Sequence, residues 1–363
     1  MRIGLVCPYS LTIPGGVQGQ VLGLARALRG HGHEVRVLGP CDGPPPDAGV
    51  TPLGKSIPFA TNGSIAPIAP DPSAALRTFR VLRDEAFDVL HVHEPLVPGP
   101  SLWAGLVKPA PIVGTFHRDG DGPDYRLGAA VLRRVVNRID IRCAVSQDAL
   151  DLAGKHFGGV YELVFNGIEV ERFAKATPYE RDERPVVFFC SRHEERKGLV
   201  VLLDALDRLP ADTRVWVGSD GPLTEELQAR FAGEERIEWL GRLSEDEKTA
   251  RLRAADVFVA SSLHGESFGV VLLEAMAAGT PVVASDLAGY AKVARQGREA
   301  VLVEPGDAAA LGDAITRVLG DSALASRLVE AGCVRADELS MDRLAEVYVE
   351  KYTRTVEASA STR

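Results

Sequence analysis

The stretch PVVFFC, from Pro185 to Cys190, opens a second series of short apolar runs in this chain of 363 residues. An unbroken apolar run of this length is typical of a β-strand that is covered on both faces. The first series opens with IGLVC, from Ile3 to Cys7, and segments with helical spacing, such as 18–30, separate its later runs. These later runs span residues 35–38, 89–92, 112–116 and 141–145. Strands that alternate with helices predict an α/β fold with a parallel, doubly wound sheet.

The two series predict two similar domains, for which the length of the chain is sufficient. After PVVFFC the apolar runs recur at residues 215–217, 237–240, 257–260, 281–284 and 300–303. Between the series, residues 170–184 are polar and charged without periodicity, which is typical of a hinge. We therefore predict Rossmann-like domains over residues 1–169 and 170–340. A C-terminal helix and a frayed tail over 341–363 are expected to pack back on the N-terminal domain.

The composition excludes several classes of protein. Apolar residues make up 45% of the chain and charged residues 25%, an ordinary globular balance. The formal net charge of -9 argues against general nucleic-acid binding, which needs a basic surface. The five cysteines form no Cys-x-x-Cys pair, so we expect free thiols in a reducing cytoplasm. There is no run of about 20 apolar residues and the N-terminus reads as a short strand, so neither a membrane span nor a signal peptide is expected.

Two glycines follow the first predicted strand. Gly15 and Gly16 precede a helical segment, so the backbone there can approach a ligand closely and the helix can present free N–H groups to an anion. The spacing is not the G-x-G-x-x-G of dinucleotide-binding proteins. A tight turn without a ligand is the alternative.

Two cations follow PVVFFC. Arg192 and Lys197 come where this strand ends, at the edge of the sheet where open α/β proteins bind ligands. An arginine fork and a lysine ammonium can hold a diphosphate and offset the negative charge that it gains as a leaving group. A solvated loop is the alternative on these residues alone.

Two glutamates, Glu266 and Glu274, stand eight residues apart around a helix that is predicted to begin near Phe268. Glu274 falls about two turns into an apolar helix, where an unpaired carboxylate is costly. Adjacent sugar or ribose hydroxyls suit such a carboxylate, because it accepts two hydrogen bonds at once. The N–H groups of Ser267, Phe268 and Gly269 can also cap a phosphate. The alternative, an exposed acid on a capped helix, fits the apolar surroundings less well.

Histidines end two predicted strands of the first domain. His117 follows the run 112–116 and either faces a reacting group or is a satisfied core histidine, which is the commoner case. The strand 89–92 ends in the motif HVHEP, which contains His91, His93 and Glu94. Metal ligation there is conceivable, but no third ligand at a fitting spacing supports it, so no metal is predicted.

Taken together, these segments resemble glycosyltransferase family 4, which has the GT-B fold of two Rossmann-like domains facing a central cleft. The glycine loop, the strand-end histidine, the Arg/Lys loop and the glutamate pair occur in the expected order, and EAMAAGTPVVAS at 274–285 is the most specific part. Within the family the chain resembles above all the actinobacterial phosphatidylinositol α-mannosyltransferases. The segments that carry this resemblance are MRIGLVCPYS at 1–10, PGGVQ at 14–18, NGS at 62–64, DVLHVHEP at 88–95 and GESFGVVLLEAMAAGTPVVASDL at 265–287.

The resemblance implies an enzyme that transfers a hexose with retention of the anomeric configuration and without a cofactor. The implied donor is a nucleotide sugar, GDP-mannose, and the implied acceptor is phosphatidyl-myo-inositol or a related glycolipid. The N-terminal domain would bind the acceptor and the C-terminal domain the nucleotide sugar.

The resemblance also assigns roles to matching residues. The implied donor site comprises Gly15, Gly16, Arg192, Lys197, Glu266, Ser267, Phe268, Gly269 and Glu274. In this site Arg192 and Lys197 bind the diphosphate, Glu266 binds the sugar hydroxyls, and the ribose falls to Glu274. The residues implied in catalysis are His117, Arg192, Lys197 and Glu266, with His117 beside the transferred sugar. The inositol end of the acceptor pocket is implied at Tyr9, Gln18 and Asn62.

The chain departs from these mannosyltransferases at three places. Residues 118–123 read RDGDGP where that group has a Thr/Ser/Lys-rich stretch, Thr61 replaces a tyrosine of their acceptor pocket, and the Arg/Lys loop is one residue shorter. The first two changes bear on the acceptor, so a family 4 enzyme with a different donor and a soluble or natural-product acceptor stays open. The non-enzyme alternative is a nucleotide-sugar sensor. The oligomeric state is left open.

One basic segment points to a membrane surface. Arg77, Arg80 and Arg83 are spaced by three on a predicted helix. The neighbouring apolar stripe consists of Leu76, Phe79 and Leu82. Such a helix can lie on anionic lipid, with about 1 kcal/mol per arginine, so we expect reversible, peripheral attachment to the inner face of the cell membrane. The alternative is an ordinary surface helix whose apolar stripe packs on the sheet.

Overall fold

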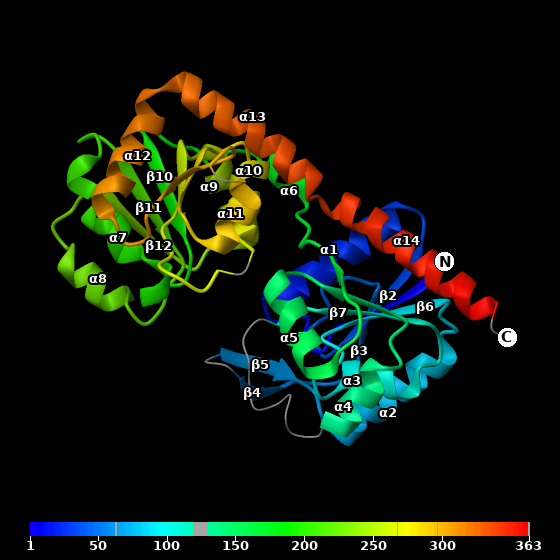
Figure 1. Cartoon of the computed structure of the whole chain (residues 1–363). Helices are drawn as coiled ribbons and strands as arrows, with labels where there is room; N and C mark the ends of the chain where they lie inside the picture. The colour runs from blue at the N-terminus through cyan, green and yellow to red at the C-terminus, as the bar shows by residue number, and fades with distance from the viewer. Residues whose placement is uncertain (62–63, 119–128, 267, 296, 362–363) are drawn as a thin grey trace. The chain divides into compact units, whose positions relative to one another are not determined.

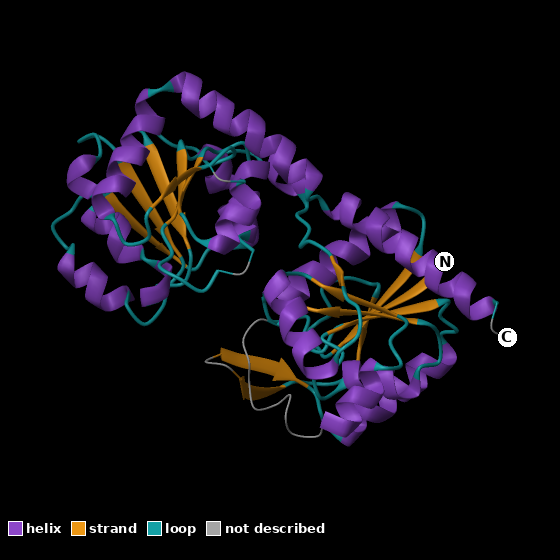
Figure 2. Ribbon diagram, viewed as in Figure 1, coloured by secondary structure: helices purple, strands orange, loops and turns teal. Residues whose placement is uncertain are grey.

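The computed structural model describes residues 1–61, 64–118, 129–266, 268–295 and 297–361. The chain forms two compact units (Figure 1). Unit 1 comprises Met1–Gly167 together with Met341–Arg363, and unit 2 comprises Ile168–Ser340. Figure 2 shows that each unit has a sheet of strands with helices around it, as the sequence predicts.

Unit 1 is built on a parallel sheet of seven strands among the described residues. They are β1 Arg2–Val6, β2 Glu34–Gly39, β3 Val50–Pro52, β6 Val89–His93, β7 Ile112–Phe116, β8 Ile141–Ala144 and β9 Glu162–Leu163. The strands lie in the order β3-β2-β1-β6-β7-β8-β9, so the winding direction reverses between the paired strands β1 and β6. In open α/β sheets, ligands bind at the carboxyl ends of the strands that flank such a switch point.

The helices of unit 1 lie around this sheet. They are α1 Gly16–Gly30, α2 Pro72–Asp84, α3 Pro100–Val107, α4 Ala129–Val136, α5 Gln147–Phe157 and α14 Met341–Ala360. A hairpin of β4 Ile57–Thr61 and β5 Ser64–Ile68 forms a separate two-stranded sheet. The turn after β1 joins this hairpin, because the Ser10 N–H donates to the Pro67 carbonyl at 2.9 Å.

The C-terminal helix α14 completes unit 1. It contacts α1, β6 and β7. Its side chains Tyr348 and Tyr352 are fully buried in the core that β1 and α1 share. At its outer end, Glu162 of β9 forms ion pairs with Lys351 and Arg354. The helix is therefore held both by apolar burial and by charge pairs at the edge of the sheet.

Unit 2 repeats the architecture with six parallel strands among the described residues, in the order β12-β11-β10-β13-β14-β15. They are β10 Val186–Cys190, β11 Arg214–Gly218, β12 Ile237–Gly241, β13 Val257–Ala260, β14 Val282–Ser285 and β15 Val301–Val303. The stretch PVVFFC forms β10, and Val186 to Phe189 are buried. The switch point lies between β10 and β13. The prediction of an α/β fold with two doubly wound parallel sheets is confirmed.

The helices of unit 2 cover its sheet. They are α6 Val170–Ala174, α7 Leu199–Asp204, α8 Thr224–Arg230, α9 Glu245–Ala254, α10 Val270–Ala277, α11 Ala288–Ala294, α12 Ala308–Gly320 and α13 Ser322–Glu338. Short 3₁₀ turns span Glu195–Lys197 and Leu206–Arg208. The apolar face of α12 lies over α7, β13 and β14, which closes the core of the unit.

The segment 170–184, in which the sequence predicts a hinge, is part of unit 2 in the structure. Its first residues form α6, whose Phe173 is buried and which contacts α9 and α10. Farther along, the Tyr179 N–H donates to the Ala250 carbonyl at 3.0 Å. Arg181 forms an ion pair with Asp256 at 2.9 Å. The segment is polar because it lies on the surface of unit 2, and contacts that are distant in sequence fix it there.

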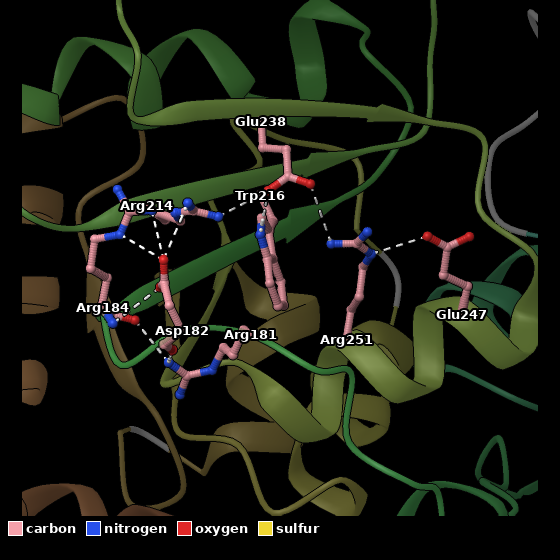
Figure 3. A network of polar contacts seen from close by, with 8 residues as sticks. All are labelled: Arg181, Asp182, Arg184, Arg214, Trp216, Glu238, Glu247 and Arg251. Atoms are coloured by element: carbon pink, nitrogen blue, oxygen red, sulfur yellow. Dashed lines mark hydrogen bonds and ion pairs between the residues drawn. The ribbon is translucent and has the colours of Figure 1, made fainter.

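Arg251 of α9 holds this segment through a polar network (Figure 3). Its guanidinium is buried, 3.9 Å from the ring centre of Tyr179 and 4.7 Å from that of Trp216. Its Nε donates to Glu247 Oε1 at 3.2 Å, and its Nη1 lies 3.9 Å from Glu238 Oε1. The Trp216 indole N–H donates to the same Glu238 at 3.0 Å. A buried cation is tolerated here because two aromatic faces and two carboxylates replace its water.

The chain passes between the units at two points that lie side by side. The Gln20 amide group donates to the Gly167 carbonyl at 2.9 Å and accepts from the Gly167 N–H at 2.8 Å. The next residue, Ile168, donates its N–H to the Leu339 carbonyl at 2.9 Å and forms a bridge with Ser340. The change of unit therefore occurs at the peptide bond after Gly167 and again at the one after Ser340.

Replacing Arg251 by methionine tests whether the stacked guanidinium holds the segment. Met fills the space without the charge, so Arg251→Met should destabilise unit 2 by about 2 kcal/mol, the value of a desolvated cation–π contact. Arg230→Met is the matched control, because Arg230 also lies over a ring, that of Phe231, but is half exposed. It should change the stability by less than about 0.5 kcal/mol.

Urea unfolding followed by tryptophan fluorescence measures both variants. Two of the three tryptophans, Trp216 and Trp239, lie in unit 2. Equal midpoints for Arg251→Met and the unchanged protein would contradict the assigned role.

Candidate active site

An ion pair between Lys197 and Glu266 joins two loops at the switch point of unit 2. Lys197 ends the 3₁₀ turn after β10, and Glu266 lies in the loop between β13 and α10. The Lys197 ammonium donates to Glu266 Oε1. The side chains are 16% and 12% exposed, so the pair is largely removed from water. Ser262 also donates to this oxygen at 2.9 Å, and Arg196 Nη1 lies 3.8 Å from it.

Backbone contacts bring these two loops together. The Leu263 N–H donates to the Arg196 carbonyl at 2.8 Å, and the Ser261 hydroxyl donates to the Gly198 carbonyl at 2.8 Å. Gly198 has φ of 65°, and a Cβ there would overlap the Ser261 carbonyl. A glycine is therefore required for the loops to approach closely enough for Lys197 to reach Glu266.

The N-terminus of α10 borders the same site. The helix begins at Val270, two residues later than predicted, with Gly269 as its N-cap at φ of 89°. A Cβ on Gly269 would lie 2.8 Å from the Tyr290 ring. The Tyr290 hydroxyl lies 3.0 Å from Ser262 Oγ, and burial raises the pKa of Tyr290 far above its usual value, with Glu266 adding to the effect. The Tyr290 hydroxyl is thus uncharged and can form a hydrogen bond with Ser262, which in turn donates to Glu266.

Arg192 belongs to a chain of charges that leads to this ion pair. Its Nη1 lies 2.9 Å from Glu194 Oε1, and its side chain is 65% exposed. Arg196 Nε donates to the other oxygen of Glu194 at 3.0 Å. Arg196 in turn approaches Glu266, so Arg192 is connected to Lys197 through two carboxylates. The structure thus brings three cations to the carboxyl edge of the sheet, where two were predicted.

Glu274 lies about one turn inside α10 and has a cationic partner, as its apolar surroundings require. Lys248 of α9 donates to Glu274 Oε1 at 3.1 Å and lies 3.2 Å from Glu245 Oε2. Burial raises the pKa of Glu274, and Lys248 opposes that shift. Burial lowers the pKa of Lys248, but the two carboxylates outweigh it and the pKa is raised. Among the described residues, no hydrogen bond or ion pair joins this group to Glu266.

In unit 1 the two glycines of the loop after β1, Gly15 and Gly16, differ in the space around them. Gly15 is the N-cap of α1, and a Cβ there would overlap the Gln18 amide. The Gln18 side chain is buried and donates to the carbonyls of Ser10 at 3.4 Å and Ile13 at 3.2 Å. Around Gly16 no protein atom lies within 4 Å of an added Cβ. A side chain at Gly15 would therefore displace the Gln18 amide, whereas the space beside Gly16 is open.

His117 follows β7, which pairs with β6 beside the switch point of unit 1. Burial lowers its pKa to about 4, so the ring is uncharged at neutral pH. Its Nε2 lies 2.9 Å from Nδ1 of His93, and its backbone N–H donates to Glu94 Oε1 at 2.6 Å. A neutral imidazole in this position can exchange hydrogen bonds with a substrate but cannot supply a charge. Within the described ranges, no group of three His, Cys, Asp or Glu side chains is arranged to hold a metal ion.

Of the residues predicted for the acceptor pocket, the structure describes Tyr9 and Gln18. Tyr9 is half-buried and forms an antiparallel bridge with Ile68 of the β4–β5 hairpin. Gln18 holds the glycine loop, so its amide already has protein partners. Asn62 and the donor residue Ser267 lie outside the described residues, as do residues 119–123. Phe268 is described and lies next to the N-cap of α10 with an intermediate exposure.

Helix α2 carries the predicted basic stripe on its surface. Arg80 and Arg83 are 80% and 76% exposed and lie 3.6 and 2.9 Å from Asp84. Arg77 lies 3.3 Å from the Ser73 hydroxyl. Of the apolar stripe, Leu82 is buried, whereas Leu76 and Phe79 are 69% and 41% exposed. No helix in the part of the chain that the structure describes is long and apolar enough to cross a bilayer.

Four contributors to the site of unit 2 are missing from the sequence-based prediction. They are Arg196, Lys248, Ser262 and Tyr290. Arg196 precedes Lys197 directly, so its position gives a usable signal. Lys248 lies among the charges of α9, where nothing in the local pattern distinguishes it from a solvated lysine. Ser262 lies in the same loop as Glu266, four residues before it. The hydroxyl of Tyr290 comes from α11, and only the packing of this helix brings it to Ser262 and Glu266.

The arrangement is suited to binding rather than to bond cleavage by the protein itself. Cations and a helix N-terminus lie at one sheet edge and can hold phosphate oxygens. Carboxylates in the same unit can accept hydrogen bonds from vicinal hydroxyls. The side chains of this site can therefore bind a molecule that combines a diphosphate with sugar hydroxyls.

Comparison with known proteins identifies the family. Residues 14–172 match Glycosyltransferase Family 4, and residues 184–321 match Glycosyl transferases group 1. A phosphatidyl-myo-inositol mannosyltransferase of Mycobacterium leprae is 41% identical over 344 residues, which cover 92% of this chain and 91% of that protein. The protein of the same name from Propionibacterium freudenreichii is 38% identical over 310 residues, which cover 81% and 79%.

Solved structures agree on the fold. A sucrose-phosphate synthase of Thermosynechococcus elongatus has a TM-score of 0.73 at 20% identity, over 98% of this chain and 99% of that chain. The Anabaena protein HepE, solved with UDP and glucose, has a TM-score of 0.74 at 17% identity, over 98% and 100%. These likenesses show the GT-B fold. With the sequence matches, they establish that the chain belongs to glycosyltransferase family 4 and is a glycosyltransferase.

Proposed function

We propose that the chain transfers mannose from GDP-mannose to phosphatidyl-myo-inositol or a related glycolipid, with retention of the anomeric configuration. The names and the high identity of the mycobacterial relatives support the sugar and the acceptor. The observation that carries the proposal is the contact of Lys197 with Glu266 beside the N-terminus of α10. It supports the proposal because a cation that can bind a phosphate and a carboxylate that can accept from hydroxyls lie side by side.

In the proposed donor complex, the ion pair separates: its lysine binds the diphosphate and its glutamate binds the sugar. Lys197 and Arg192 turn to the phosphate oxygens, and Glu266 accepts from the mannose hydroxyls. Arg196 and Ser262 keep the carboxylate in place when the lysine leaves it. Exchange of one partner for another avoids an unpaired buried charge, which favours binding. Glu274 takes the ribose hydroxyls, with Lys248 balancing its charge.

Transfer then depends on position and on charge. The bond between the anomeric carbon and the diphosphate breaks, and a bond to the acceptor oxygen forms on the same face of the sugar. The acceptor hydroxyl gives its proton to the departing phosphate oxygen, so the protein need not supply a base. The cations stabilise the charge that the diphosphate gains, which is the main catalytic term. His117 is uncharged and orients the sugar through a hydrogen bond. No metal takes part in this scheme.

The acceptor side of the proposal uses Tyr9, Gln18 and Asn62 for the inositol. The departures at Thr61 and residues 118–123 favour, as a second candidate, a family 4 enzyme with another acceptor. A soluble acceptor that replaces phosphatidylinositol in a turnover assay would select this second candidate. A protein that binds GDP-mannose but never releases GDP would instead be a sensor.

Lys197→Ala tests the assigned phosphate ligand. Loss of one preorganised cation should lower kcat/KM about 100- to 1000-fold. The fold should persist, because Ser262 and Arg196 still hold Glu266. Lys175→Ala is the control, since Lys175 pairs with Glu171 on the surface of α6 and is 78% exposed. GDP release from GDP-mannose with phosphatidylinositol vesicles is the measurement. Near-normal turnover in a folded Lys197→Ala protein would reject the role.

Gly16→Ala tests the approach of the donor phosphate. The added methyl group meets no protein atom and improves helix propensity, so stability should not fall. A methyl group in the path of a phosphate should raise the donor KM by at least about 10-fold, equivalent to about 1.4 kcal/mol. Gly19→Ala is the matched control, because Gly19 is exposed on the same helix with equally open space. Equal KM values for the two variants would count against a phosphate at Gly16.

The arginines of α2 are proposed to contact anionic lipid. Replacing Arg77, Arg80 and Arg83 by glutamine should weaken binding to phosphatidylinositol vesicles by roughly 100-fold at low salt, at about 1 kcal/mol per arginine. The control replaces Arg230, Arg317 and Arg327, three exposed arginines of unit 2. Vesicle sedimentation measures both proteins. If the two triple variants lose affinity equally, α2 has no special place at the membrane.

A further inference from the structure

The motif HVHEP, residues 91–95, ends β6 and takes no part in the proposed reaction, yet its polar side chains all contact the end of β7. The two strands pair in parallel, with His93 opposite Thr115. The carboxyl end of β6 therefore lies beside the residue that follows β7, which is His117. The contacts form two layers.

The deeper layer is structural. His91 is fully buried, with Nδ1 2.7 Å from the Tyr352 hydroxyl and Nε2 2.7 Å from Thr115 Oγ1. The Tyr348 hydroxyl lies 2.9 Å from the same Thr115 oxygen. Both ring nitrogens of His91 thus have partners, and the layer ties β6 and β7 to α14. The ring of His91 also lies 4.1 Å from that of His93, measured between ring centres.

The outer layer consists of His93 and His117. Their rings are stacked with centres 5.1 Å apart, and Nδ1 of His93 lies 2.9 Å from Nε2 of His117. Burial lowers the pKa of His93 well below its usual value and that of His117 to about 4. Both rings are therefore neutral at physiological pH. In a bond between two neutral imidazoles, one nitrogen donates and the other accepts.

The surroundings of His93 favour one direction for this bond. If His117 donated, His93 would carry its proton on Nε2, which is buried and has no hydrogen-bond partner in the described part of the chain. Buried N–H groups without an acceptor are rare, because they lose the bond that water gives them. If His93 donates from Nδ1, its proton is bonded. His117 then accepts at Nε2 and carries its own proton on Nδ1.

Glu94 fixes the backbone to which the ring of His117 is attached. Its Oε1 accepts from the His117 N–H at 2.6 Å, and its own N–H donates to the Thr115 carbonyl at 2.8 Å. Glu94 has φ of 44°, a left-handed conformation that a side chain rarely adopts. Such strain persists where surrounding contacts enforce it, and it is concentrated at functional sites. The motif therefore holds both the backbone and the ring of His117.

We propose that His93 is a positioning residue for sugar transfer: it holds His117 in the tautomer that offers Nδ1–H to a hydroxyl of the transferred hexose. The proposal rests on the proposed place of His117 beside that sugar. Nδ1 is the nitrogen of His117 that remains for a substrate, since the hydrogen bond to His93 occupies Nε2.

Kinetics of three variants test the effect on the reaction. His93→Leu removes the donor, so kcat should fall about 10- to 100-fold, as for other residues that orient a reacting group, with little change in the donor KM. His93→Asn places an amide N–H near the former Nδ1 and should restore most of kcat. His31→Asn changes a partly exposed histidine that pairs with Asp342 and should leave kcat unchanged.

Nitrogen-15 NMR of histidine-labelled, ligand-free protein tests the tautomer without any substrate. We expect His117 to be protonated on Nδ1 in the unchanged protein and in His93→Asn, and on Nε2 in His93→Leu. His117 protonated on Nε2 in the unchanged protein would overturn the proposal, even if His93→Leu fails to fold. So would a His93→Leu protein in which both the tautomer and kcat are unchanged. The expected tautomer in a protein that transfers no sugar would support the histidine arrangement and count against the proposed function alone.

Discussion

The ion pair of Lys197 and Glu266 is the interaction on which the site of unit 2 depends. It is mostly buried, and a buried ion pair contributes little to stability in comparison with apolar residues of the same volume. The loops nonetheless keep it, together with Arg196, Ser262 and a glycine that allows their close approach. A cluster that stability does not require, at the carboxyl edge of a parallel sheet, fits the proposed ligand, which has both phosphate and hydroxyl groups.

Both units use the same feature of their sheets. In unit 1 the switch point lies between β1 and β6. The glycine loop follows β1, and the motif HVHEP lies at the carboxyl end of β6. In unit 2 the switch point lies between β10 and β13. The Arg/Lys loop follows β10, and the loop of Glu266 follows β13. The repeated topology thus places two pairs of loops at corresponding positions of the two sheets, and the residues of these loops differ between the units. The C-terminal helix α14 belongs to unit 1. Its Tyr352 hydroxyl contacts His91 of β6, and its Tyr348 hydroxyl contacts Thr115 of β7.

The sequence predicts those parts of the structure that local patterns determine. PVVFFC contains β10 because an unbroken apolar run is stable as a strand that is buried on both faces. Glu274 has a cationic partner because its surroundings are apolar. The identity of that partner, Lys248, depends on the packing of α9 against α10 and leaves no local pattern. The packing of residues 170–184 on unit 2 leaves no local pattern either, since Arg251 contacts Tyr179 from more than 70 residues away. His117 is both a buried, hydrogen-bonded histidine and a candidate for substrate contact, and the strand register that pairs it with His93 cannot be read from spacing alone.

The central claim is that one nucleotide sugar is held by these cations and carboxylates while its mannose moves, with retained configuration, to an inositol lipid. Proton NMR of the product formed from GDP-mannose and phosphatidylinositol tests it most directly, with UDP- and ADP-sugars as parallel donors. The account predicts an α-mannosyl product from GDP-mannose. A β-linked product, or transfer from a UDP- or ADP-sugar and none from GDP-mannose, would contradict it.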